Sequence, residues 1–306
     1  MNEIVKVREL RKNYGRFPAL RGATFSVPRG ATVGLLGPNG SGKTTTIKIL
    51  IGLLRRNGGI VEVFGYDPWQ DEIEVKKRVG VLHERPLYPL NARVKEILRY
   101  ASRLRGYDDR EVQRVAGLVG IRDMLDFKVK NLSRGYLQRL GLSLALIGDP
   151  ELLLLDEPTA NLDPYARVEI LRLIKTLKED LGVTVMISSH IIPELKEVCD
   201  YAIFIRDGRV ADYGPISELA LKYGVTATYL VKAERARALA RELLSLSYVL
   251  GVELRNDVLL VKVKGSLASE FESLVDNVKG DFMVSSFRLV GSELGEIYEK
   301  IFTKKS

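Results

Sequence analysis

The chain of 306 residues contains one cysteine, Cys199, and only two histidines. A single cysteine excludes a disulfide within the chain, which is typical of proteins in a reducing compartment. Long apolar runs are lacking as well. The densest is the leucine run 152–155, whereas a helix that crosses a bilayer needs about 20 apolar residues. We therefore expect a protein that is soluble, or that meets a membrane only through a partner.

Acidic residues are fewer than basic ones, and the formal net charge is +8. This excess suits phosphate ligands, nucleic acid and an anionic membrane surface equally well, so it does not choose among them. Hydrophobic residues make up 46% of the chain, which is enough to bury a core. The length favours one large domain with a small one, or two domains.

A glycine-rich segment, GPNGSGKTT at residues 37–45, lies between an apolar run and a predicted helix. The run 31–36 is typical of a short buried strand, and 46–50 begins the helix. This context turns the pattern G-x-x-x-x-G-K-[ST] into a phosphate-binding loop, with the positive end of the helix directed at the same point. Lys43 would reach the β- and γ-phosphates, and the Thr44 hydroxyl would ligate Mg²⁺. The predicted nucleotide ligands in this loop are Gly37, Pro38, Asn39, Gly40, Ser41, Gly42, Lys43, Thr44 and Thr45.

A second segment places two carboxylates at the end of a buried strand. The leucines at 152–155 are what a strand covered on both faces needs, and Asp156 and Glu157 follow directly. Ligands bind at this carboxyl edge of a parallel sheet. We expect Asp156 to hold Mg²⁺ and Glu157 to deprotonate the attacking water. The alternative is that the two carboxylates are merely solvated at the strand end. The phosphate loop in the same chain favours the functional interpretation.

Three other positions are weaker signals when each is taken alone. Tyr14 lies in a turn, where it either stacks on a base or packs locally. Ser133 is a plausible helix N-cap, so that helix is either a second anion site or an ordinary capped helix. His190 follows the apolar strand 183–187, at the edge where a γ-phosphate is expected, although a lone histidine is usually structural.

Together these segments resemble the nucleotide-binding subunit of an ATP-binding-cassette (ABC) transporter, over about residues 3–220. The matches follow the family's order. Tyr14 matches the aromatic that stacks on adenine, residues 37–45 match the Walker A loop, and residues 132–136 match the signature motif, usually L-S-G-G-Q. Asp156 and Glu157 match Walker B, residues 161–163 match the D-loop, and His190 matches the switch histidine. The resemblance implies catalytic roles for Glu157 and His190.

For the fold, the sequence and the resemblance predict an α/β P-loop NTPase core over residues 1–222. Its mixed sheet would have antiparallel N-terminal strands, predicted over 3–35, and a helical insertion at about 86–140. From 226 to 306 the order β-α-β-β-α-β predicts a small α+β ferredoxin-like domain. That domain has no cluster of catalytic residue types, so a structural or partner-binding role is favoured over ligand sensing.

The family's mechanism implies partners. Two cassettes dimerise head to tail, and Ser133 and Gly135 of one contact the γ-phosphate of ATP held by the other. We therefore expect ATP and Mg²⁺ as ligands, a second copy of the chain as partner, and a separate transmembrane permease. The protein would be cytoplasmic, peripheral on the inner face of the cell membrane.

Two residues depart from the family pattern. Glu84 stands where the Q-loop glutamine is usual; its carboxylate can still ligate Mg²⁺ but adds negative charge near the phosphates. Arg134 replaces the first signature glycine, so its side chain either points away from the phosphate or helps to neutralise it. Similar variants occur in the exporter branch, which often carries a C-terminal extension like 226–306, and this favours export.

The alternative is a soluble ABC ATPase that acts on nucleic acid or ribosomes. Positive charge permits it, but the translation-factor type joins two cassettes in one chain. The DNA-repair type inserts long coiled coils between Walker A and the signature, and the segment between Lys43 and Ser133 is too short for these. No aromatic and basic residues interleave as in an RNA-binding platform. We therefore expect no nucleic-acid partner.

Overall fold

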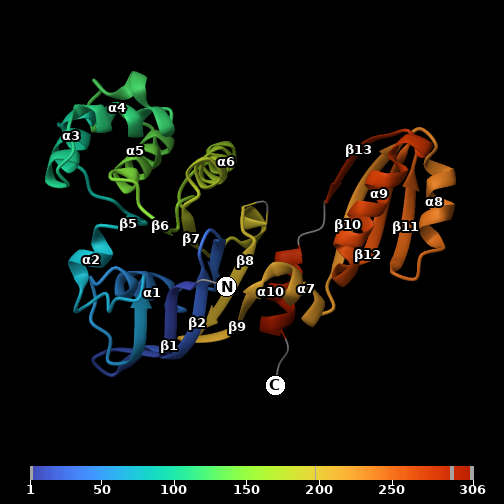
Figure 1. Ribbon diagram of the computed structural model, residues 1–306, viewed down its shortest axis with the longest axis horizontal. Helices are drawn as coiled ribbons and strands as arrows, with labels where there is room; N and C mark the ends of the chain where they lie inside the picture. The colour runs from blue at the N-terminus through green and yellow to red at the C-terminus, as the bar shows by residue number, and fades with distance from the viewer. Residues whose placement is uncertain (1–2, 197, 290–292, 304–306) are drawn as a thin grey trace. The chain divides into compact units, whose positions relative to one another are not determined.

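The computed structural model describes residues 3–196, 198–289 and 293–303. The chain divides into two compact units, Met1–Tyr213 and Gly214–Ser306 (Figure 1). The short helix α7 (Ile216–Lys222) is thereby grouped with the second unit, whereas the sequence places it in the first domain. Its contacts explain this grouping, because α7 packs on the C-terminal helix α10 (Glu293–Thr303) and on the turn η4 (Gly265–Leu267). The functional limits 1–222 and 226–306 stay a prediction.

The first unit contains two sheets. Strands β1 (Glu3–Tyr14), β2 (Phe17–Pro28) and β4 (Gly58–Val63) form an antiparallel sheet in the order β2-β1-β4. The second sheet has the order β5-β6-β7-β3-β8-β9, with β5 to β8 paired in parallel. Its strands are β3 (Thr32–Leu36), β5 (Val79–Leu82), β6 (Leu152–Asp156), β7 (Thr184–Ser189), β8 (Tyr201–Arg206) and β9 (Arg209–Pro215).

The antiparallel N-terminal strands agree with the prediction, but they form a sheet of their own, and the antiparallel part of the N-terminal segment ends earlier than predicted. It stops at Pro28, and β3 pairs in parallel with β7 and β8. The reason is visible in burial: every residue of β3, β6 and β7 is buried, as in parallel strands covered on both faces. The carboxyl ends of these three strands therefore lie side by side.

Glu151, the residue before β6, forms ion pairs with two arginines. Glu151 accepts a hydrogen bond from Arg78 and a second one, 2.6 Å long, from Arg29. The Arg78 hydrogen bond, supported by Arg29 and opposed by partial burial, lowers the pKa of the Glu151 carboxyl to about 2. Because the folded pKa lies below the ordinary one, this pairing stabilises the fold at neutral pH and is lost as the pH falls through about 2.

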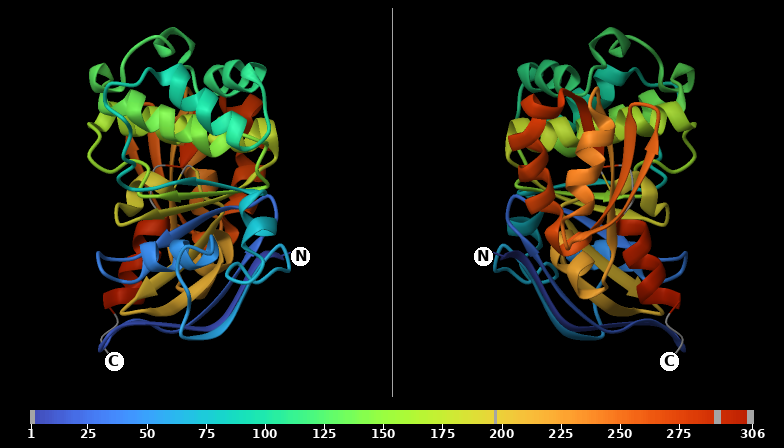
Figure 2. Two further views of the ribbon diagram at one scale, coloured as in Figure 1. Left: turned by 90° about the vertical axis from the view of Figure 1, so that its left-hand side faces the viewer. Right: turned by 90° about the vertical axis from the view of Figure 1, so that its right-hand side faces the viewer.

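The helices of the first unit pack in part on the parallel sheet and in part on one another. They are α1 (Lys43–Leu50), α2 (Glu72–Lys76), α3 (Val94–Leu104), α4 (Asp109–Leu118), α5 (Arg134–Leu146), α6 (Pro164–Leu181) and the 3₁₀ turns η1 (Arg122–Met124), η2 (Val129–Asn131) and η3 (Ile192–Leu195). Helices α3, α4 and α5 lie together, apart from the antiparallel sheet (Figure 2). They form the predicted helical insertion, although α5 continues past residue 140. None of the helices in the described ranges has the length and apolar composition that crossing a bilayer requires.

The second unit has its own sheet and core. After α7 come β10 (Thr226–Ala233), α8 (Ala236–Leu244), β11 (Val249–Arg255), β12 (Val258–Lys264), α9 (Ala268–Phe282), β13 (Val284–Leu289) and α10. The four strands pair antiparallel in the order β11-β12-β10-β13. One apolar cluster joins alternate residues of β10 and β12 to α8 and α9. This is the β-α-β-β-α-β arrangement of a ferredoxin-like fold.

Candidate functional site

Two positions in the loop between β3 and α1 accept little besides glycine. At Gly37 a Cβ would lie 2.1 Å from the carbonyl oxygen of Ile205. Gly42 has φ of 110°, and a Cβ there would lie 2.7 Å from the Leu20 side chain. Ser41 is 2% exposed, and its hydroxyl has no hydrogen-bond partner in the described structure. A buried polar group without a partner is rare, and Ser41 lies within the loop without lining the cavity described below.

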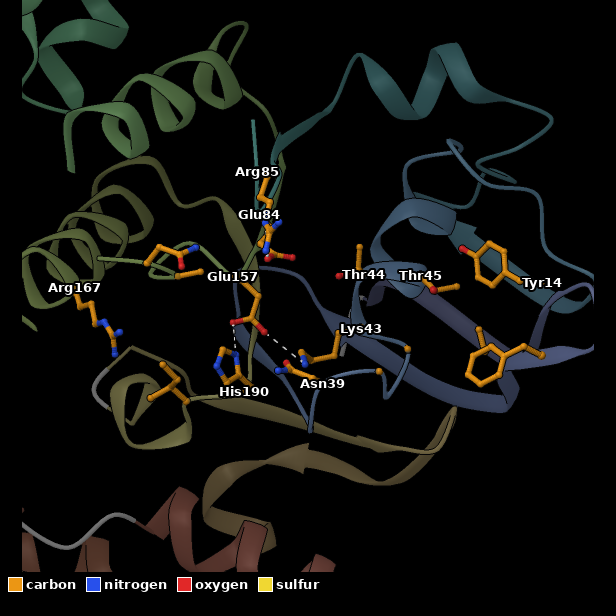
Figure 3. A pocket seen from close by; sticks show the side chains of 17 residues that line it. Tyr14, Asn39, Lys43, Thr44, Thr45, Glu84, Arg85, Glu157, Arg167 and His190 are labelled. Atoms are coloured by element: carbon orange, nitrogen blue, oxygen red, sulfur yellow. Dashed lines mark hydrogen bonds and ion pairs between the residues drawn. The ribbon is translucent and has the colours of Figure 1, made fainter. Parts of the chain in front are cut away.

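Lys43, Glu157 and His190 meet at one point although they come from three segments (Figure 3). Lys43 Nζ donates to the carbonyl oxygens of Gly37, at 2.9 Å, and Pro38, at 3.2 Å. It also lies 3.5 Å from Glu157 Oε1, and the two side chains are only 6% and 9% exposed. The other carboxylate oxygen, Glu157 Oε2, is 2.9 Å from His190 Nδ1. The carboxylate is thus held between a cation and an imidazole.

Asp156 lies beside this group and has hydrogen-bond partners of its own. Its Oδ1 accepts a 3.2 Å hydrogen bond from the Thr44 hydroxyl and a 2.6 Å hydrogen bond from the Ser188 hydroxyl. Ser188 Oγ in turn accepts from the backbone N–H of Glu157, at 3.0 Å. Asp156 and Glu157 therefore have different partners. Glu157 lies just beyond the end of β6 with φ of 50°, so the chain has already turned out of the strand there.

Ser188 belongs to this site, and the sequence analysis did not single it out. It lies directly beside Asp156 in the register of β6 and β7. The signal was present, because Ser188 and Ser189 precede His190 at the end of an apolar strand. Only the pairing of the two strands shows that the hydroxyl reaches Asp156.

A cavity of about 610 Å³ opens over these residues, a size typical of ligand sites. Ten predicted site residues line it: Tyr14, Asn39, Gly40, Gly42, Lys43, Thr44, Thr45, Glu84, Glu157 and His190. Gly37, Pro38, Ser41 and Asp156 belong to the same segments without lining it. Phe17, 61% exposed, is a second aromatic that the sequence analysis missed, and it pairs with Tyr14 across the β1–β2 turn.

Glu84 lines the cavity from the loop after β5, next to Arg85. Arg85 Nε lies 3.4 Å from Glu84 Oε1 and is otherwise well exposed. The sequence analysis did not single out Arg85. Its cation offsets part of the negative charge that Glu84 adds.

The segment 132–136 does not reach this cavity. Ser133 caps α5, and its hydroxyl accepts a 3.4 Å hydrogen bond from the N–H of Tyr136. The Arg134 side chain points toward the loop after Glu157, where Nη1 donates a 2.8 Å hydrogen bond to the carbonyl oxygen of Asn161. Neither Ser133 nor Gly135 lines the cavity of this chain.

Comparison with known proteins assigns this arrangement. A family model described as ABC transporter matches residues 20–160. The fluoroquinolones export ATP-binding protein of Mycobacterium tuberculosis is 37% identical over 221 residues, which cover 72% of this chain and 73% of that protein. An uncharacterized ABC transporter ATP-binding protein of Bacillus subtilis, YxlF, is 29% identical over 303 residues, covering 97% of this chain and 99% of that protein. A solved ATP-binding subunit of an ABC transporter has a TM-score of 0.65 at 27% identity, covering 72% of this chain and 94% of that one.

The chain belongs to the ATP-binding subunits of ABC transporters. As such it binds and hydrolyses ATP to power transport, and its partner is a membrane permease. The predicted family, P-loop fold and ATPase activity are confirmed. These relatives favour the transporter over a soluble ATPase that acts on nucleic acid or ribosomes.

The two units of this ABC subunit differ in which of these matches cover them. The family model covers the phosphate loop, the signature segment and the Asp156–Glu157 pair, and ends before His190. YxlF, in contrast, is similar over almost the whole chain. The second unit is therefore shared with a relative, and it lies outside the part that defines the family.

Proposed function

We propose that this ATPase works as a homodimer and drives export through its permease. ATP would lie between the phosphate loop of one protomer and Ser133 and Gly135 of the other. The observation that carries this proposal is the incomplete cavity of the single chain. It contains the loop, Glu157 and His190, while the Ser133 helix start, a natural anion site, lies elsewhere.

In the proposed reaction Glu157 accepts a proton from water as the water oxygen bonds to the γ-phosphorus and the bond to ADP breaks. His190, at 2.9 Å, fixes the orientation of that carboxylate. Lys43 exchanges its bonds to Gly37 and Pro38 for phosphate oxygens. Phosphoryl transfer requires mainly positioning and charge stabilisation, and these three side chains supply both.

For Mg²⁺ the proposed ligands are Thr44, Asp156 and Glu84, and the bound ion supplies positive charge to the phosphate oxygens. No group of three or more His, Cys, Asp or Glu side chains among the described residues is placed to hold a metal ion. The protein would thus share the ion with ATP and water, which is how Mg²⁺ is usually bound.

The direction and the location are further parts of the proposal. Export is supported by the name of the Mycobacterium tuberculosis relative, a fluoroquinolones export protein. Because ATP is used inside the cell, the subunit would be cytoplasmic and lie on the inner face of the membrane against its permease. For the second unit we propose a structural or partner-binding role.

The dimer is tested by size exclusion with light scattering on the full chain. With Mg²⁺ and a non-hydrolysable ATP analogue we expect the mass to double from the 34.3 kDa of one chain. With the analogue and EDTA it should remain that of a monomer. A protein that binds the analogue at full occupancy, with Mg²⁺, and stays monomeric would contradict the proposed shared site.

The substitution Glu84→Gln tests the role of Glu84, which replaces the family's usual glutamine in the loop after β5. Removing this negative charge from the cavity should leave ATP affinity within about twofold and change turnover about three- to tenfold, because one charge near the phosphates shifts a barrier by about 1 kcal/mol. Turnover is measured by phosphate release and affinity by nucleotide titration. The control is Glu218→Gln, an exposed carboxylate on α7. Equal turnover of the variant and the wild type would refute a role for Glu84.

A further inference from the structure

The loop 159–163, which follows Glu157, is held by side chains from three directions. Thr159 Oγ1 donates to Glu194 Oε2, at 3.1 Å. Arg167 donates from Nε to the Leu162 carbonyl oxygen, at 2.9 Å, and from Nη1 to Glu194 Oε1, at 2.8 Å. These three hydrogen bonds tie the loop to η3, just beyond His190, Thr159 directly and Leu162 through Arg167. A further contact, from Arg134, comes from the start of α5.

The position of this loop bears directly on Glu157. The N–H of Ala160 donates to the Glu157 carbonyl oxygen, at 3.0 Å, so the loop turns back on the residue that carries the carboxylate. Asn161, with φ of 61°, lines the nucleotide cavity. Glu157 itself has φ of 50°, a conformation that only surrounding contacts can maintain in a residue with a side chain. The loop therefore bears on the backbone of Glu157, which carries the carboxylate.

Arg134 is poorly suited to its place if its task is to stabilise α5. It is the first residue of that helix, where the helix dipole favours acidic side chains and disfavours a cation. Its guanidinium instead donates to Asn161 O, at 2.8 Å. The starts of α5 and α6 are also adjacent, since a Cβ at Gly135 would lie 3.9 Å from Ala166 Cβ. The helix start that carries Ser133 and the loop 159–163 are thus joined in one chain.

We propose that Arg134 is a positioning residue that ties the loop 159–163 to the signature helix of its own protomer. This inference rests on the proposed dimer, in which that helix start faces the ATP held by the partner. ATP at the partner's site then holds the helix start, Arg134 holds the loop, and the loop holds Glu157 at the other site. The two sites gain a coupling free energy through one side chain, and such coupling is reciprocal.

The alternative role of Arg134, neutralising the phosphate held by the partner, makes the opposite prediction for mixed dimers. The test uses Arg134→Gly, because glycine is the family's usual residue there and leaves Ser133 and Gly135 in place. Glu157→Gln restricts hydrolysis to one site of each dimer. The chains are co-expressed with two different affinity tags, purified as mixed dimers in Mg-ATP, and assayed in a single turnover with labelled ATP.

In the first mixed dimer, Arg134→Gly is on the chain that keeps Glu157. We expect its rate to be about five- to tenfold below that of the wild-type/Glu157→Gln dimer, the effect of losing one exposed hydrogen bond, with an unchanged KM for ATP. In the second, Arg134→Gly and Glu157→Gln are on the same chain, and we expect the reference rate. In the Arg134→Gly homodimer, the Hill coefficient for ATP should fall from above 1 toward 1. Arg110→Ala, which removes an exposed cation from α4, is the charge control.

A reduced rate only in the second dimer would show that Arg134 acts on the partner's ATP, and would overturn the inference. Reference rates in both dimers, with an unchanged Hill coefficient, would overturn it as well. Failure of the proposed function is recognised separately, since the wild-type/Glu157→Gln pair would then not associate in Mg-ATP at all, and the inference would fall with it.

Discussion

Glu157→Gln is expected to lower ATP turnover by about 100- to 10,000-fold, the usual contribution of a general base. Glutamine preserves the shape of the side chain and can still contact Lys43 and His190, which lie 3.5 Å and 2.9 Å from the carboxylate. It cannot accept the proton of the attacking water. ATP should bind with near wild-type affinity, so the nucleotide-bound dimer should accumulate. Phosphate release measures the turnover, and light scattering in Mg-ATP measures the dimer.

The matched control for this variant is Glu179→Gln on α6, an exposed carboxylate outside the cavity, which should turn over ATP like the wild type. Thermal unfolding of both variants shows whether the fold is retained. A folded Glu157→Gln protein with more than a tenth of the wild-type turnover would show that another group activates the water.

Lys43→Met is expected to weaken ATP binding by about 100-fold or more and to abolish measurable turnover. Lys43 is the buried cation of the phosphate loop, and its Nζ already lies among oxygen acceptors at 2.9 Å and 3.2 Å. Hydrogen bonds to charged groups contribute about 1.5–3 kcal/mol each, so losing its contacts to the β- and γ-phosphates removes several kcal/mol of binding. Methionine keeps most of the volume without the charge. Titration with a fluorescent ATP analogue measures the affinity.

Lys48→Met is the control, because Lys48 lies on the same helix and is exposed. It should bind ATP as the wild type does. Lys43→Met also leaves Glu157 with His190 as its remaining partner at 2.9 Å, so its thermal unfolding should be recorded without nucleotide. A folded Lys43→Met protein with unchanged affinity would remove the basis for assigning the phosphate site to this loop.

Residues 37–45 show how much local sequence can determine. A strand, a glycine-rich turn and a helix start are all encoded within a few residues, whereas the nearest atoms that a Cβ would meet at Gly37 and Gly42 belong to Ile205 and Leu20, outside the loop. The same holds for the leucines before Asp156, whose complete burial follows from an uninterrupted apolar run. Such features were predictable because the residue pattern that encodes each of them is local, even though the contacts that bury them come from distant segments.

Three other features required the pairing of distant segments. The assignment of β3 to the parallel sheet depends on its register with β7 and β8. The grouping of α7 with the second unit depends on α10, far along the chain. The 2.6 Å hydrogen bond from Ser188 to Asp156 exists only because β6 and β7 are neighbours.

Arg134 marks the limit most clearly. From the sequence its side chain had two possible directions, away from the phosphate or toward it, and nothing local chooses between them. The sequence by itself determined the phosphate loop, the acidic pair and the order of the elements, because hydrophobic pattern and backbone sterics act over a few residues. Only the tertiary structure decided where Arg134 and Ser188 make their bonds, because a side chain chooses among partners that folding brings near from far along the chain.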